Sequence, residues 1–552
     1  GRSTALDPEP APALPEGTPK LLAALVERCL SGDRARRPAS GQAMVEELLA
    51  VQRGLEGIGV ASTRGRTLRL ALALAGAGVV AAAVYLLVLH RSGTETALPS
   101  VAVLPFADLS PGKDQEYFAD GVAEEILNAL SHVEGLRVVG RTSSFSFKGK
   151  GVQIQEIGRQ LNVGAVLEGS LRREGDRVRI TAQVVNAADG YHVWSESYSR
   201  QITGIFEVQD DITRAVVEAL KVKLLPGKPP GSEGRTTSAE SYNHYLLGRR
   251  HLSRGTLEGA QWGKEAFEKA IALDPRNAPA QAGLAWAFMS MYTLGLQTTA
   301  AEVARLRQQM LAAAEKAVEL DPGLAMAYST RGFMRLSVFD WEGGKADLDR
   351  TLALSPRDPD ALSTYGWFQG MLGRPGDGIP MAKRATEIDP LAGRAWGILG
   401  HLYMATGQFD LARAAQDRLL EIAPEDPVAW ERRFELLLLE GRPEAALSAA
   451  RRITEPNHRA YRLMGIAMAE YDLGHIAESN RALEELMTLP DCQAGQVYAW
   501  RGDADRAFEW LERAWREGDP YATLIKLDPM LRKIRGDPRY LALLKKMNLP
   551  VD

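Results

Sequence analysis

Cysteine is almost absent from this sequence, because Cys29 and Cys492 are the only two among 552 residues. A disulfide framework needs several pairs, and a CxxC metal site needs two cysteines close together, so both are excluded. The eight histidines are scattered and form no HExxH motif. The sequence therefore predicts no catalytic, cofactor-binding or metal-binding residue in this chain.

An excess of either charge is also lacking. The chain holds 66 Lys and Arg against 70 Asp and Glu, which gives a formal net charge of −4. Because phosphate binding requires a concentrated basic surface, this balance argues against nucleic acid as the main partner. Hydrophobic residues make up 45% and charged residues 25%. This composition is ordinary for a globular protein, and the length allows three or four domains.

One stretch lacks charged side chains altogether, from Leu70 to Leu89 (LALALAGAGVVAAAVYLLVL). As a helix it would be about 30 Å long, the thickness of a bilayer's hydrocarbon core, so we expect a transmembrane helix. More basic residues precede it than follow it, which predicts a single-pass protein of a bacterial cytoplasmic (inner) membrane, with a cytoplasmic N-terminus and extracytoplasmic C-terminal domains. Gly78 and Ala82 form a small-xxx-small pair that would allow a homodimer.

Two helices are expected in residues 1–52, and residues 53–69 form a basic segment before the apolar stretch. The run CLSGDRARRPAS at residues 29–40 joins the two helices. It resembles the end of the carboxy-terminal lobe of a bacterial serine/threonine protein kinase, on the matching positions Cys29, Leu30, Asp33, Arg37, Pro38 and Ser40. This resemblance implies that residues 1–52 are a remnant of such a lobe; the alternative is a helix pair without catalytic ancestry.

The chain itself should be inactive as a kinase. It has no Gly-rich loop, no His-Arg-Asp and no Asp-Phe-Gly, so nothing holds ATP, metal or base. ATP and Mg are expected only for a complete kinase lobe. The chain begins at Gly1 rather than Met, and we expect it to be a fragment of a longer, signal-transducing kinase.

Residues 98–224 are expected to form an α/β domain in the order β-α-β-α-β-β-β-α, with hairpins at Gly175 and Gly190. The region resembles the small α/β domain related to the amino-terminal domain of TolB, which implies recognition or assembly rather than a reaction. The runs that carry the resemblance are AVLPFADLS (102–110), YFADGVAEEILNAL (117–130), LRVVGRTSSFSFKGKG (136–151), VLEGSLRREGDRVRITAQVVNAADGYHVWSESYSR (166–200) and IFEVQDDI (205–212).

This α/β region is the most basic part of the chain. Lys148 and Lys150 alternate with glycines, which faintly suggests a phosphate cradle, but the GxxxxGK[ST] spacing is missing. A solvated basic face is the favoured interpretation, and the role of the hairpin arginines stays open. The residues concerned are Arg141, Lys148, Lys150, Arg172, Arg173, Arg177 and Arg179.

Residues 225–240 are rich in Pro, Gly and Ser and are expected to be a linker. Residues 241–552 contain prolines that recur with gaps of 47, 34, 34, 34, 32 and 34 residues, at Pro275, Pro322, Pro356, Pro390, Pro424, Pro456 and Pro490. A 34-residue period is that of the tetratricopeptide repeat, in which each unit is two antiparallel helices. The clearest copy covers residues 391–424, with Trp396, Leu399, Gly400, Tyr403, Ala412 and Pro424 on the signature positions.

About eight such units are expected, followed by a capping helix with Leu541, Leu544 and Met547. The predicted fold class is therefore multidomain: a single transmembrane helix, a small α/β domain and an all-α tetratricopeptide solenoid. The concave face of the solenoid is expected to bind protein or peptide partners. Two functions remain open: the sensory half of a serine/threonine protein kinase, or a non-enzymatic, membrane-tethered scaffold for envelope protein assembly.

Overall fold

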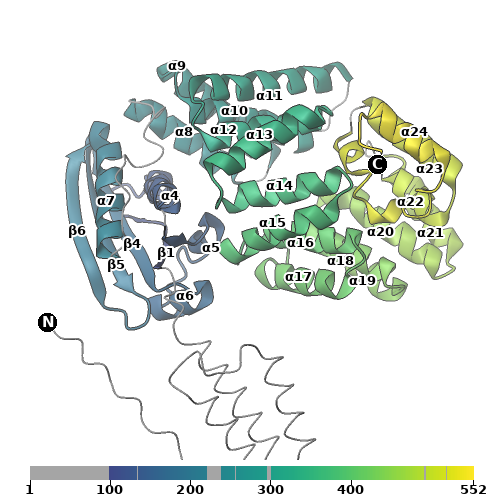
Figure 1. The fold of residues 1–552 in the computed structure, drawn as a ribbon, viewed down its shortest axis with the longest axis horizontal. Coiled ribbons are helices and arrows are strands. Elements are labelled where there is room, and N and C mark those ends of the chain that lie inside the picture. The colour runs from purple at the N-terminus through teal and green to yellow at the C-terminus, as the bar shows by residue number, and fades with distance from the viewer. Residues whose placement is uncertain are drawn as a thin grey trace, which may run out of the picture. The chain divides into compact units, whose positions relative to one another are not determined.

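The computed structural model describes residues 99–133, 135–220, 238–254, 256–294, 300–489, 493–517 and 519–551. An α/β region comes first along the described chain, and an array of helices follows it (Figure 1). From Leu98 onward the two parts belong to one contiguous unit. The predicted kinase remnant, basic segment, apolar stretch and most of the predicted linker lie outside the described residues.

The α/β region is built on one mixed sheet with the strand order β3-β1-β4-β5-β6, and β2 lies beside β4. Strand β1 is parallel to both β3 and β4, whereas β4, β5 and β6 form an antiparallel meander. The strands are β1 (Ser100–Val103), β2 (Ala107–Asp108), β3 (Arg137–Val138), β4 (Ala165–Glu174), β5 (Arg177–Asn186) and β6 (His192–Gln201).

Strand β1 ends earlier than the expected strand over residues 100–106. Pro105 has no backbone N–H with which to continue a ladder, and pairing resumes only at β2. Side chains alternate across β1: Val101 and Val103 face one hydrophobic cluster, Ala102 and Leu104 the other. Helices α4 (Glu116–Ser131) and α7 (Ile205–Ala219) cover the first face, and α6 (Ile154–Leu161) covers the second. The short α5 (Arg141–Phe145) contacts β1.

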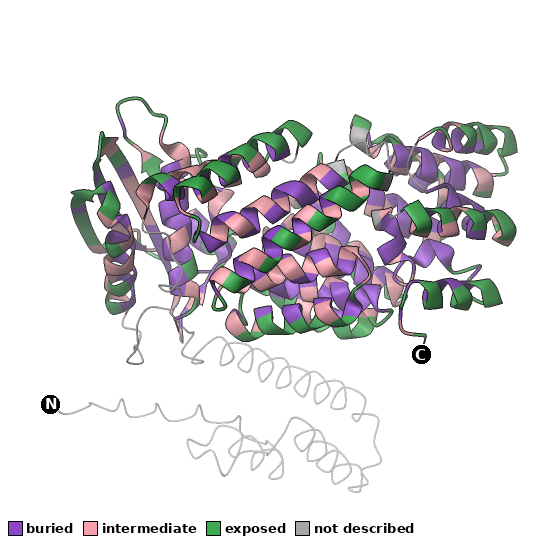
Figure 2. Cartoon of the chain, turned by 90° about the horizontal axis from the view of Figure 1, so that it is seen from above, coloured by how far each residue is buried: buried purple, intermediate pink, exposed green. Residues whose placement is uncertain are grey.

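Eight helix pairs lie within the described part of residues 239–517, as the repeat period predicts. The pairs are α8 (Ala239–Leu252) with α9 (Leu257–Leu273), α10 (Ala278–Leu294) with α11 (Ala300–Leu320), α12 (Ala325–Ser337) with α13 (Trp341–Leu354), α14 (Pro359–Met371) with α15 (Pro375–Ile388), α16 (Gly393–Ala405) with α17 (Phe409–Ile422), α18 (Pro427–Leu439) with α19 (Pro443–Arg451), α20 (Arg459–Asp472) with α21 (Ile476–Leu486), and α22 (Ala494–Arg501) with α23 (Ala504–Glu517). Helices such as α17 and α21 bury one side and expose the other, whereas α22 is buried along almost its whole length (Figure 2).

The 47-residue proline gap falls in the second pair. Helices α10 and α11 have 17 and 21 residues, against 13 and 14 in α14 and α15. Part of the extra length therefore lengthens the helices and is not confined to the connection between them.

The structure corrects the predicted membrane span. No helix in the described ranges is long and apolar enough to cross a bilayer, and the stretch from Leu70 to Leu89 lies outside those ranges. The architecture that is described is a largely helical repeat array with a small α/β region. On this finding the fold class with a single transmembrane helix and the single-pass inner-membrane location are not supported.

The turn inside each repeat explains why glycine recurs there. Gly373, Gly407 and Gly441 follow one another at 34-residue intervals and have φ values of 82°, 74° and 72°. At Gly441 the next amide, Arg442 N, donates to Leu437 O at 2.8 Å, which closes a helix C-terminal turn.

Replacing Gly441 with alanine is expected to lower the free energy of unfolding by about 1 kcal/mol, because a Cβ is strained at positive φ. A matched control is Gly376→Ala in the first turn of α15, where nothing lies within 4 Å of an added Cβ and φ is ordinary. That change should raise stability by about 0.5 kcal/mol. Chemical denaturation of both variants tests the pair, and shifts of the same sign would contradict the expectation.

Candidate protein-binding surface

The first helices of successive pairs form the inner layer of the array. Helix α14 contacts α16, and the series continues through α18 and α20 to α22. The second helices make no contacts of similar extent with one another in the described residues. Because helices on the inside of a curved stack approach more closely, the first helices line its concave face.

The C-terminal segment, residues 519–551, lies on this inner face. It contains two 3-10 helices, η4 (Pro520–Leu524) and η5 (Pro529–Leu531), and one α-helix, α24 (Pro538–Lys546). Leu527 packs against Leu402 of α16 and against Gly370 of α14, where an added Cβ would lie 2.9 Å from Leu527 Cδ1. Further contacts join η4 to α12 and η5 to α22. The segment thus contacts first helices from α12 to α22.

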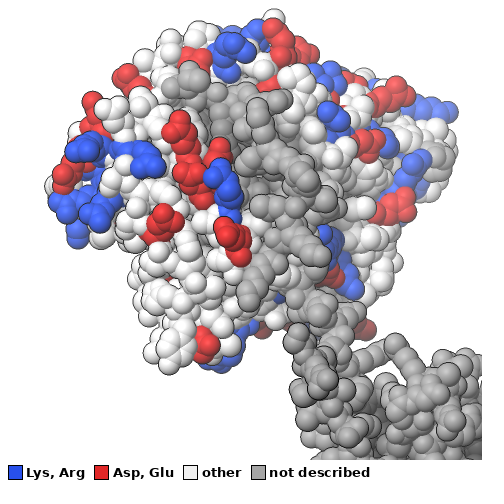
Figure 3. All heavy atoms as spheres, turned by 60° about the vertical axis from the view of Figure 1, so that its left-hand side comes forward, with Lys and Arg blue, Asp and Glu red and all other residues white. Residues whose placement is uncertain are grey.

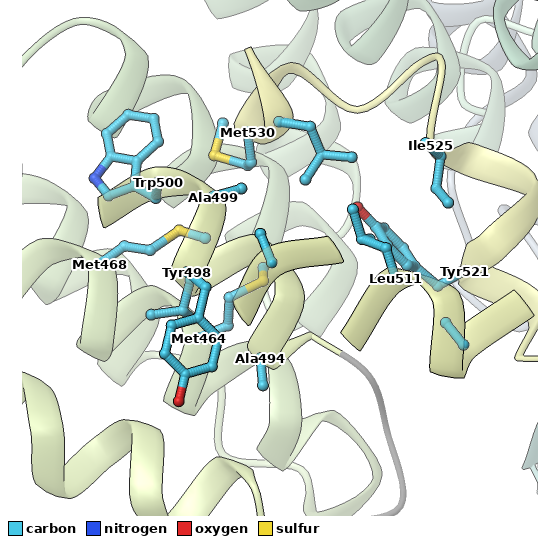
Figure 4. Packing of buried hydrophobic residues seen from close by; sticks show 14 of the residues in the cluster. Met464, Met468, Ala494, Tyr498, Ala499, Trp500, Leu511, Tyr521, Ile525 and Met530 are labelled. Carbon is cyan, nitrogen blue, oxygen red and sulfur yellow. The ribbon is translucent and has the colours of Figure 1, made fainter. Parts of the chain in front are cut away.

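Burial of apolar side chains holds the segment in place. Figure 4 shows part of this cluster, in which side chains of the segment lie among those of the last repeats. The fully buried apolar residues of the segment are Ala522, Ile525, Leu527, Met530, Leu531 and Leu543, each 0% exposed.

The predicted capping helix corresponds to α24, but the segment reaches further than a cap. Leu544 and Met547 are buried, whereas Leu541 is 43% exposed. Trp341, at the start of α13 in the third pair, donates from Nε1 to Met547 O at 3.0 Å. The end of the chain therefore returns to the middle of the array, which the repeat pattern did not predict.

A polar cluster lies beneath the segment at the centre of the inner face. Arg432 of α18 donates to Glu435 at 2.8 Å and lies 3.4 Å from Glu431. Both glutamates are almost fully buried, at 3% and 2% exposure. Asp528 of the segment accepts from Gln496 Nε2 of α22 at 2.6 Å, from Tyr521 Oη and from its own loop at Met530 N.

The cluster on α18 contains two carboxyl groups and one guanidinium group. Burial raises the pKa of Glu431 to about 8, and burial also raises the pKa of Glu435, while Arg432 acts against both shifts. Burial and the nearby Arg432 lower the pKa of His401 well below its usual value, so this imidazole is neutral. The cluster was not predicted from the sequence, where its one local signal is the i, i+4 spacing that puts both glutamates on one face of α18.

The α/β region is docked on the array through Asp389, at the end of α15. Its carboxylate accepts hydrogen bonds from Thr142 N at 3.2 Å, from Ser143 N at 2.7 Å and from Ser143 Oγ. These amides belong to the first turn of α5, whose own N-cap residue, Gly140, offers no side chain. Asp389 therefore caps a helix of the α/β region from within a repeat.

A second contact joins α4 to the first helix of the array. Glu124 accepts from Arg141 Nε at 2.8 Å and pairs with Arg249 of α8. Burial raises its pKa, but the two arginines outweigh that effect and hold the pKa of Glu124 below its usual value. Around this ion pair, the sheet's core is continuous with apolar side chains of α8 and α9, including Tyr242, Leu246 and Phe267.

Several basic residues of the α/β region are paired with acidic or amide side chains. Lys148 contacts Glu116 at 2.9 Å, and Arg172 pairs with Glu174. Arg173 donates to Gln115 Oε1 at 3.1 Å and lies over the Phe118 ring. On the face seen in Figure 3, basic and acidic side chains lie side by side. The arrangement is that of a solvated surface rather than a phosphate cradle.

Two open pockets occur outside the inner face. One, of about 490 Å³, lies beyond the carboxyl end of β1 and is lined by Phe106, Phe147 and Lys148 among others; the second, of about 400 Å³, lies between α8 and α9 beside His251 and Trp262. Among the described residues no group of three or more His, Cys, Asp or Glu is placed to hold a metal ion.

Comparison with known proteins agrees with the repeat architecture. The family profile "Tetratricopeptide repeat" matches residues 371–433, which confirms the repeats predicted from the 34-residue period. A curated protein of Rhizobium meliloti (strain 1021), "Putative adenylate cyclase 3", is 41% identical over 189 residues, covering 34% of this chain and 32% of that protein. This chain thus spans about a third of the length of that relative.

Solved structures of repeat proteins also resemble the array. The type IV pilus biogenesis factor PilW matches with 20% identity and a TM-score of 0.33, over 38% of this chain and 92% of PilW. YrrB, described as a TPR protein with an unusual peptide-binding site, matches with 20% identity and a TM-score of 0.26, over 40% of this chain and 98% of YrrB. A thermophilic TPR protein of Thermus thermophilus matches with 19% identity and a TM-score of 0.31, over 36% of this chain and 99% of its own. The chain contains tetratricopeptide repeats, and such repeats serve protein interaction.

Proposed function

We propose that this chain is the partner-binding, regulatory part of a bacterial signalling protein. The observation that supports this function most is the inner face of the tetratricopeptide array, which is the surface such repeats use to bind an extended peptide or a partner's helix. The docking of α5 on Asp389 adds a route by which a partner on the array would act on the α/β region.

Cross-linking would test where the partner binds. The full chain is treated with a lysine-reactive cross-linker in an extract of its source organism, and linked peptides are identified by mass spectrometry. We expect partner links from lysines of the array and the C-terminal segment, such as Lys345, Lys383 and Lys533. Lys113 and Lys150 of the α/β region serve as the internal control. Links concentrated on these two lysines would contradict the proposal.

The enzyme that this part regulates has two candidates. The run at residues 29–40 supports a serine/threonine kinase, because it resembles the end of a kinase lobe. The Rhizobium meliloti relative supports an adenylate cyclase instead, through its printed name alone. Both enzymes use ATP, so one assay separates them: the natural gene product is incubated with ATP and Mg²⁺. A kinase yields phosphoserine or phosphothreonine and ADP, whereas a cyclase yields cyclic AMP and pyrophosphate.

A further inference from the structure

The inner face of the array is already occupied in this chain. The C-terminal segment covers first helices from α12 to α22 and buries Leu527 between α14 and α16. An external peptide cannot reach Leu402 or Gly370 while Leu527 is in place. Binding on this face therefore requires that the segment leave.

The contacts of the segment are of a kind that allows it to leave as a unit. It forms 3-10 turns and one short helix and contributes no strand or helix of the repeat pattern. Its links to the array are buried apolar contacts, hydrogen bonds such as Trp341 Nε1 to Met547 O and Gln496 Nε2 to Asp528, and two exposed ion pairs with α23. These pairs join Arg539 to Asp505 and Lys546 to Glu512. The eight repeat pairs keep their own helix-to-helix contacts without it.

Departure of the segment would expose Glu431 to solvent and take Asp528 away from it. The pKa of Glu431 would then fall from about 8 back toward its ordinary value, so both glutamates would be ionised at neutral pH and one negative charge would be unmatched. Glu431 and Glu435 share one cation, Arg432, which lies on the same helix. The other titratable or charged groups that face this pair are Asp426 at the start of α18, His401 of α16, Tyr461 of α20 and Asp528 of the segment. None of these adds a positive charge, because His401 is neutral.

We propose that residues 519–551 are an intramolecular ligand that closes the inner face, and that the partner that displaces them carries an apolar anchor beside a lysine or arginine. The apolar anchor takes the place of Leu527 between α14 and α16. The cation takes the place of Asp528 and pairs with the second glutamate, which Arg432 alone does not balance. This inference rests on the proposed function of the inner face. It adds that the C-terminal segment must be displaced before a partner binds, and that the partner carries a positive charge.

The test uses the full chain and two labelled peptides. One peptide has the sequence of residues 519–537, and the other is the same peptide with Asp528→Lys. The chain is prepared as wild type and as Leu527→Ala, called the opened chain because its segment loses the contact with α14 and α16. Leu541→Ala is the control, at an exposed position of α24. Hydrogen exchange reports whether residues 519–551 are released, and fluorescence anisotropy reports peptide binding.

We expect exchange in the segment to be at least tenfold faster in Leu527→Ala and unchanged in Leu541→Ala. Only the opened chain should bind peptide, and it should bind the Asp528→Lys peptide at least tenfold more tightly than the unmodified one. Adding Glu431→Gln and Glu435→Gln to the opened chain should abolish this preference, because the charge that selects the cation is gone.

Three results would overturn the proposal. The claim that the segment blocks the inner face is refuted if wild type binds the cationic peptide as tightly as Leu527→Ala does. It is also refuted if neither Leu527→Ala nor a second variant, Met530→Ala, speeds exchange in the segment. The partner's charge is refuted if the opened chain prefers the unmodified peptide. An opened chain that binds neither peptide also refutes the inference, while cross-links from array lysines to a cellular partner would still support the proposed function.

Discussion

Replacing Asp389 with alanine should lower the free energy of unfolding by about 3 kcal/mol, because three donors of α5 lose their acceptor in a buried site. Asp389 is only 2% exposed. Burial raises the pKa of this carboxyl above its ordinary value, and the hydrogen bonds from Ser143 offset part of that shift. The structure holds the side chain there because the first turn of α5 has no other cap. Denaturation by guanidinium followed by circular dichroism measures the loss.

Two further variants make this prediction specific to docking. Gly140→Ala should have a similar effect, since an added Cβ would lie 2.5 Å from Asp389 Cγ and push the carboxylate away. Asp360→Ala removes an aspartate whose side chain is 87% exposed, and it should change stability by less than about 0.5 kcal/mol. Hydrogen exchange should rise in α5 for the first two variants only. Unchanged exchange in α5 of Asp389→Ala would show that the α/β region is not held through this contact.

The repeats were predictable from sequence because each unit meets the same steric demand. The glycines at positions 373, 407 and 441 recur where φ must be positive. At Gly366, where α14 and α15 cross, an added Cβ would lie 2.8 Å from Gly378 O. The strands of the α/β region were predictable from their alternation and turn glycines. These signals are local, so no knowledge of the partner element is needed to read them.

The contacts between parts of the chain that are far apart in sequence leave no such local signal. Asp389 belongs to one of several Asp-Pro pairs at repeat boundaries, and nothing nearby in sequence distinguishes the one that caps α5, 246 residues away. Leu544 and Met547 show a helix with an apolar face, which is what a terminal cap requires. Only the fold shows that this helix ends beside Trp341, whose Nε1 donates to Met547 O.

The second large effect concerns pH. Burial raises the pKa of Glu431 in the folded chain to about 8, against an ordinary value of 4.5. The folded state therefore binds this proton more tightly than the unfolded state does. The resulting stability is fully present below about pH 4.5 and is lost as pH rises through about 8. Raising the pH across this interval should destabilise the array around α18 and loosen its hold on the C-terminal segment.

Glu431→Gln keeps the shape of the protonated side chain and removes the titration. At pH 5 the variant should match wild type, whereas at pH 9 it should be more stable by about 3 kcal/mol, because wild type then holds a second carboxylate beside Glu435 with only Arg432 to balance both. Thermal or chemical denaturation from pH 5 to 9 measures the difference. Glu484→Gln, at an exposed position of α21, should show the same pH dependence as wild type. A Glu431→Gln variant that loses stability with rising pH as steeply as wild type would mean that another group carries the titration. The charge imbalance inferred for the inner face would then be absent.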